Sequence, residues 1–111
     1  MSRAEYLEFA EQKIWEYLAD DVMYPCVWAE KVVTTKRDEQ KQTDLAEEFS
    51  REVAAWSYWD DIIEEAEASG AGFKRPDIEQ LAVSAMRADL DEWNALTDDE
   101  QQTYFSNYGI E

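Results

Sequence analysis

Carboxylates are the chemically active side chains that this sequence supplies in quantity. Its 111 residues include 27 aspartates and glutamates, no histidine and a single cysteine. The densest run lies between Asp60 and Glu67, where five of eight residues are acidic. Carboxylates at such density can bind a divalent cation, transfer protons, or attract a basic partner. The remaining residues decide among these three kinds of chemistry.

Catalysis and metal binding find little support in the residue types. Without histidine the chain lacks the commonest general acid–base group and the usual zinc ligand. Cys26 has no histidine to activate it, and the three glycines do not form a phosphate-binding loop. The acidic run 89–92 lacks the turn glycine of a calcium loop. We therefore expect no catalytic residue, no cofactor and no specific metal site. A buffer for divalent cations, using the acids of 60–65, is kept as an alternative that ranks below the two functions given at the end of this section.

The charge balance indicates the kind of partner. The formal net charge is −17, far beyond the magnitude of about 2–8 that suffices for solubility. Residues 1–43 hold 9 acidic and 6 basic residues, whereas residues 44–111 hold 18 acidic and 4 basic residues. Such a surface repels nucleic acid and anionic lipid, so we expect a basic protein partner and neither nucleic acid nor membrane. The lone cysteine, together with the absence of a long apolar run, favours the cytoplasm.

Apolar residues recur with a helical period over most of the chain. Ser2 and Glu5 have the spacing of a capping box, which predicts a helix from there to about Asp20. A break is expected at 21–24, followed by a second segment from Pro25 to Thr35 that we interpret as helix rather than strand, because no second strand is available to pair with it.

The second half of the chain continues the pattern. A loop is expected at 36–42, then a long helix over 44–68 capped by Thr43 or Asp44, then a loop at 69–76. Another helix should start at Asp77, and a second capping box at 97–100 opens a short helix that Gly109 ends. The prediction is a single all-α domain spanning 1–111, a compact bundle of four to five helices.

The predicted helix 44–68 carries the proposed contact residues. Like charges three or four residues apart destabilise a helix, so the clustered acids of this helix do not stabilise the fold. On one helix face they repeat about every 5–6 Å, close to the spacing of phosphates along a nucleic acid strand. Trp59 is the candidate for an exposed aromatic anchor beside them. The main acidic contacts are expected at Asp60, Asp61, Glu64 and Glu65, and the next block at Glu47, Glu48 and Glu52.

Size, charge and composition together resemble the small acidic inhibitors that phages and mobile elements use against CRISPR or restriction enzymes. The resemblance is compositional and rests on no aligned motif. It implies a non-enzymatic protein that occupies the basic nucleic-acid site of such an enzyme in the host cytosol. The alternative is a helical adaptor or regulatory subunit that binds a protein through an exposed aromatic groove. The basic residues of 31–41 can pair with acids of a neighbouring helix or of a second copy, so a homo-oligomer stays open.

Overall fold

The computed structural model describes residues 1–19 and 27–110. All secondary structure in this part is helical, which confirms the all-α class, although there are six helices rather than four or five. The break expected at 21–24, Pro25 and Cys26 lie outside the described residues. The helices are α1 (Arg3–Ala19), α2 (Val27–Thr34), α3 (Glu39–Ala54), α4 (Tyr58–Ser69), α5 (Arg75–Asn94) and α6 (Asp98–Tyr108).

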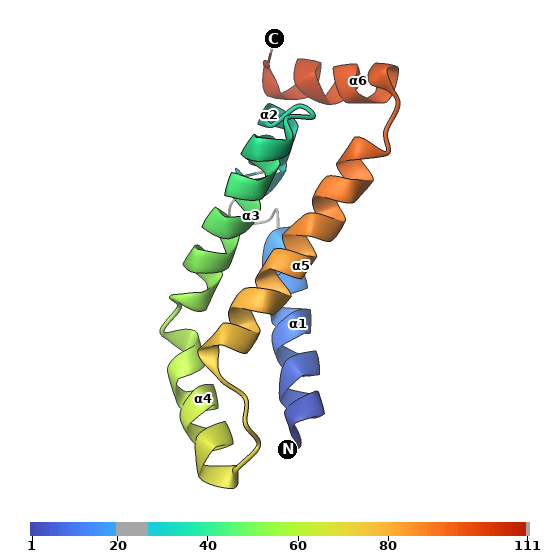
Figure 1. The fold of residues 1–111 in the computed structure, drawn as a ribbon. Helices are drawn as coiled ribbons and strands as arrows, with labels where there is room; N and C mark the ends of the chain where they lie inside the picture. Colours follow the sequence, from blue (N-terminus) through green and yellow to red (C-terminus); the bar gives the residue numbers. More distant parts are fainter. Residues whose placement is uncertain (20–26, 111) are drawn as a thin grey trace.

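The helices build an elongated body rather than a compact bundle. α3 and α4 follow each other along one side, α5 returns beside α3, and α1 packs against α5 (Figure 1). α2 and α6 lie at the opposite end from α4, with α6 across the top of the body (Figure 1). The principal extents are 51 × 27 × 19 Å, and the radius of gyration is 15.9 Å, against about 13 Å for a compact chain of this length. The compact shape expected from the sequence is therefore wrong.

Both predicted capping boxes are present. The Ser2 hydroxyl accepts from the Glu5 amide and the Glu5 carboxylate accepts from the Ser2 amide, while Thr97 and Glu100 make the same pair at the start of α6. Gly109 ends α6 with a left-handed backbone (φ 67°), a conformation that favours glycine. In the described part of 25–35 the segment is helical, as expected.

The long helix predicted over 44–68 is instead two helices. α3 begins earlier, at Glu39, because the Asp38 side chain accepts from the Lys41 amide and caps it, so neither Thr43 nor Asp44 is the cap. The helix ends at Ala54, and residues 55–57, which we call the joint, separate it from α4. The carbonyl of Val53 accepts from the Trp59 indole at 2.8 Å.

The Arg75 guanidinium also holds the joint. It donates to the Ala54 carbonyl and forms an ion pair with Asp60 in the first turn of α4, at 2.6 Å. These two side chains satisfy carbonyls that a continuous helix would have satisfied with its own amides. Side chains thus end α3 without any proline or glycine in the joint.

Aromatic rings fill the centre of the body. Trp59 is fully buried (0% exposed) and stacks on the half-buried Trp56, with ring centroids 6.0 Å apart. Trp93 and Trp28 are buried as well. Trp15 is the tryptophan that reaches the surface, at 38% exposed. Trp59 is therefore a core residue, and its predicted role as an exposed anchor is wrong.

α5 starts slightly earlier than expected, at Arg75 with Pro76 in its first turn. Its packing against α3 includes a polar tie, since the amides of Gln42 and Asn94 bond each other reciprocally at 2.8 and 3.0 Å. Within the described residues, no helix has both the length and the apolar character needed to cross a membrane.

Candidate acidic interface

α4 presents most of its carboxylates to solvent. Its inward side consists of the buried Trp59 and Ala66 with the half-buried Ile62 and Ile63, so the acids occupy the remaining circumference. Asp60, Asp61, Glu64 and Glu65 are all exposed, and the helix contains no lysine or arginine. The first block predicted from the sequence therefore lies on one helix.

Packing against the next helix divides this block. Asp60 forms the ion pair with Arg75 at 2.6 Å, so its charge is compensated inside the protein. Asp61, Glu64 and Glu65 form no ion pair with any described residue, and no lysine or arginine exists in the masked stretches 20–26 and 111. These three exposed carboxylates are therefore accessible to the cations of a partner.

The second predicted block, on α3, has a different electrostatic setting. Glu47, Glu48 and Glu52 are exposed, but Glu48 pairs with Lys31 of α2 at 2.8 Å. Arg51 lies four and three residues after Glu47 and Glu48, so it shares their helix face. The exposed side of α3 thus has mixed charge. Contact between these three residues and a partner stays a prediction.

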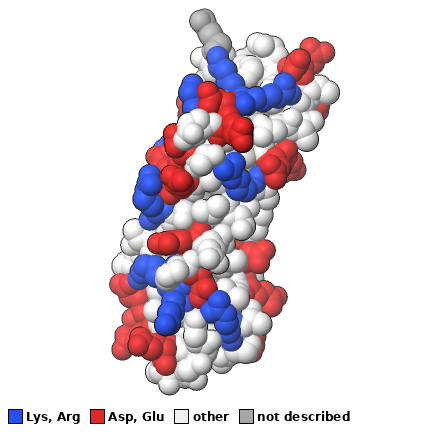
Figure 2. All heavy atoms as spheres, in the orientation of Figure 1, with Lys and Arg blue, Asp and Glu red and all other residues white. Residues whose placement is uncertain are grey.

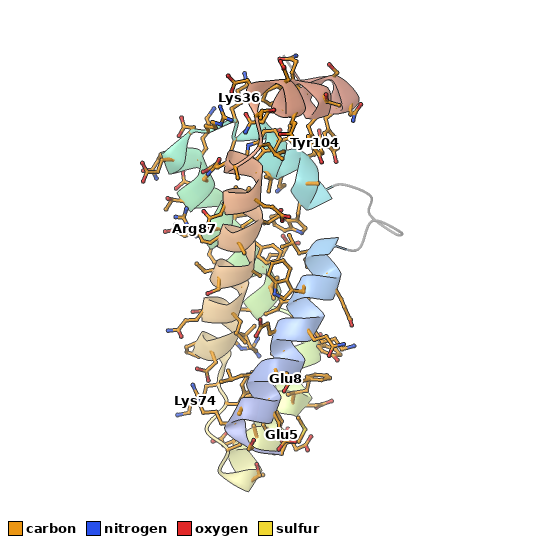
Figure 3. The ribbon with its side chains drawn as sticks, turned by 90° about the vertical axis from the view of Figure 1, so that its right-hand side faces the viewer. Glu5, Glu8, Lys36, Lys74, Arg87 and Tyr104 are labelled. Carbon is orange, nitrogen blue, oxygen red and sulfur yellow. The ribbon has the colours of Figure 1, made fainter. Side chains whose placement is uncertain are left out.

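α1 adds carboxylates beside α4. Tyr6 of α1 is buried and stacks on Phe73, with centroids 5.6 Å apart, and it lies close enough to Glu65 for that charge to act on it. Burial, reinforced by the negative charge of Glu65, raises the pKa of the Tyr6 hydroxyl. Glu5 and Glu8 lie on the exposed side of α1 near the same end of the molecule (Figure 3).

We call this group of exposed carboxylates the acidic end; it comprises Glu5, Glu8, Asp61, Glu64 and Glu65. Hydrogen bonds and an ion pair hold the start of α1 in place at this end of the molecule. The Ser2 backbone and hydroxyl lower the pKa of Glu5, so its carboxylate stays charged into mild acid. Arg3 forms a bidentate pair with Asp77 at 2.8 and 2.9 Å and also donates to the Gly72 carbonyl, which fixes the start of α1 to the start of α5.

Charge of both signs covers the face of the molecule that Figure 1 presents. In that orientation, lysines and arginines stand among the acids from one end to the other (Figure 2). In the described part of the chain, five ion pairs involve Arg3, Lys13, Lys31, Arg37 and Arg75. α4 itself contains no lysine or arginine, so its carboxylates have no cation on their own helix.

A groove that contains two carboxylates was not predicted from the sequence. A groove of about 310 Å³ lies between α2, α5 and α6, lined by Asp89, Glu92, Trp93 and Tyr104 together with aliphatic side chains. Asp89 and Glu92 are three residues apart and share a helix face, which the sequence did show. The approach of α2 and α6 to that face depends on tertiary packing, so the groove had no sequence signal.

The described residues contain no group of three or more acidic or cysteine side chains placed to hold a metal ion. The chain matches no protein-family model, and no curated protein or solved structure is significantly similar to it.

Proposed function

We propose that this protein is an acidic inhibitor that occupies the nucleic-acid-binding surface of a basic protein, such as a CRISPR effector or a restriction enzyme. The observation that carries the proposal is an elongated body, 51 Å long, with a net charge of −17 and with nearly all the carboxylates of its described residues exposed. A DNA duplex of that length carries about 30 phosphate charges, at one per 1.7 Å. The protein therefore has more than half the linear charge density of a duplex.

The acidic end is the part of the surface most suited to this contact. Its carboxylates come from two helices, α1 and α4, and Tyr6 of α1 is buried against Phe73 in the loop that follows α4, which holds the start of α1 near the end of α4. Rigid charge arrays steer association and compete with a nucleic acid for the same cationic groove. Asp60 is the exception, because Arg75 already neutralises it.

The test is displacement of a fluorescently labelled DNA duplex from purified CRISPR effectors and restriction endonucleases, measured by fluorescence anisotropy. The protein should release the duplex from at least one enzyme, and its apparent affinity should fall steeply as salt rises. Release that is insensitive to salt, or no release from any enzyme, would contradict the proposal.

Matched variants locate the contact. Three exposed ion pairs of about 0.5 kcal/mol each correspond to roughly a tenfold change in affinity. The variant of the acidic end should lose that much, whereas a control with the same change in net charge outside both predicted blocks should lose much less. The variant is D61N with E64Q and E65Q, and the control is E11Q with E39Q and E79Q, all at exposed positions. Equal losses would show that only net charge matters.

The second candidate function is the helical adaptor, and the groove between α2, α5 and α6 favours it. An adaptor partner would contact the apolar and aromatic walls of that groove and would not displace a DNA duplex from a nucleic-acid-binding enzyme. The displacement assay therefore separates the two functions.

A further inference from the structure

The groove between α2, α5 and α6 combines a carboxylate pair with apolar walls. Asp89 and Glu92 line it from α5, Ala29, Val32 and Val33 from α2, and Leu96 and Tyr104 from the C-terminal region. Its volume of about 310 Å³ is at the lower end of the range for ligand sites, which suits one inserted side chain rather than a helix.

Neither carboxylate has a cationic partner. Every lysine and arginine of the chain lies in the described part, and none of them forms an ion pair with Asp89 or Glu92. The nearest in sequence, Arg87, donates instead to the Thr43 hydroxyl at 2.8 Å. Burial, with the charge of Glu92 adding to it, raises the pKa of Asp89, so ionisation of Asp89 is less favourable here than for a carboxyl in water.

An aromatic ring stands at the rim of the groove. Tyr104 is 43% exposed and meets the buried Trp93 edge-on, with centroids 5.7 Å apart. Figure 3 shows Tyr104 on the side of α6 that faces α2 and α5. Trp93 is held in place because its indole donates to the Lys36 carbonyl at 2.5 Å. The exposed ring thus lines the same groove as the two carboxylates and is packed against Trp93.

We propose that this groove receives an arginine side chain of the partner protein, with the guanidinium on Asp89 and Glu92 and its flat face against Tyr104. A guanidinium is planar, bonds carboxylates through several donors and stacks on aromatic rings. Its aliphatic stem matches the side chains of α2. The inference rests on the proposed function for a basic partner, and it adds a specific contact to the general attraction of the acidic end.

The test uses a small probe, acetyl-arginine-amide, titrated into the full-length ¹⁵N-labelled protein and followed by NMR. Saturable shifts should appear at the Trp93 indole and at the amides of Asp89, Glu92 and Tyr104. The citrulline analogue has the same shape without the charge, and it should bind at least about tenfold more weakly. Equal binding of both probes, or shifts spread over all acidic residues without saturation, would overturn the proposal.

Paired variants make the result independent of folding defects. Asp89→Asn keeps the size and shape of the side chain and should remain folded, yet weaken the arginine probe by about tenfold or more. Asp91→Asn makes the same change at an exposed position of α5 outside the groove and should leave binding unchanged. Similar weakening by both would show that only net charge acts, which contradicts a specific pocket.

The ring contact is tested separately. Tyr104→Leu keeps an apolar side chain but removes the face on which the guanidinium stacks, and it should weaken the arginine probe several-fold. Tyr58→Leu, at an exposed tyrosine of α4, is the control. These titrations need no enzyme. Absence of arginine binding in the groove and absence of enzyme inhibition would therefore be observed in different experiments.

Discussion

Replacing the buried Trp59 by alanine should destabilise the protein far more than replacing the exposed Trp15. The side chain is fully buried, stacks on Trp56 and donates to the Val53 carbonyl. Removal of a buried tryptophan costs about 3–5 kcal/mol in free energy of unfolding, through lost burial and the cavity left behind. For a domain of this size about 4 kcal/mol corresponds to a fall in Tm of roughly 15 °C.

Trp15 provides the matched control, because it is the same residue type at 38% exposed. Its replacement by alanine should change the free energy of unfolding by about 0.5 kcal/mol or less. Thermal unfolding of both variants, followed by far-UV circular dichroism, measures the difference. If the Trp59 variant unfolds at the same temperature as the Trp15 variant, the burial of Trp59 and the joint built around it are refuted.

Three further outcomes are expected. Arg75→Ala removes the donor to the Ala54 carbonyl and should cost about 1–3 kcal/mol in chemical denaturation, whereas Arg51→Ala, at an exposed site, should cost much less. The guanidinium of Arg3 lowers the pKa of Asp77, so the pair stabilises the fold above the unfolded pKa of about 4, and this stabilisation is lost as the pH falls through the folded pKa. The Tm difference between wild type and Arg3→Ala should therefore shrink in acid, and a difference that stays constant with pH would contradict this. Added salt at neutral pH should raise the Tm by screening repulsion among the carboxylates, and a flat profile would count against that repulsion.

Helix content and helix ends were largely predictable from local sequence. The capping boxes and the glycine at 109 act through hydrogen bonds within a few residues, so their spacing alone identifies them. The joint was not predictable in this way, because nothing at 55–57 breaks a helix. It is made by Trp59 and Arg75, and Arg75 reaches the end of α3 from the start of another helix.

The joint also explains the misplaced tryptophan. In a continuous helix Trp59 falls beside the apolar stripe that includes Phe49 and Val53. Ending α3 at Ala54 gives α4 its own orientation, and Trp59 then faces the core. The acidic character of the surface was evident from composition, but the pairing of Asp60 was not, since its partner is fifteen residues away.

The stacked indoles at the joint have an optical consequence. The rings of Trp56 and Trp59 lie nearly parallel, at an interplanar angle of 7° and a centroid separation of 6.0 Å. Transition dipoles at such short range couple, and the coupled pair gives a circular dichroism signal whose sign and size depend on the angle between the rings. Any partner, variant or solvent that straightens the chain between α3 and α4 must change that signal. The circular dichroism signal of these two tryptophans therefore reports, without any label, on the orientation of α4 relative to α3.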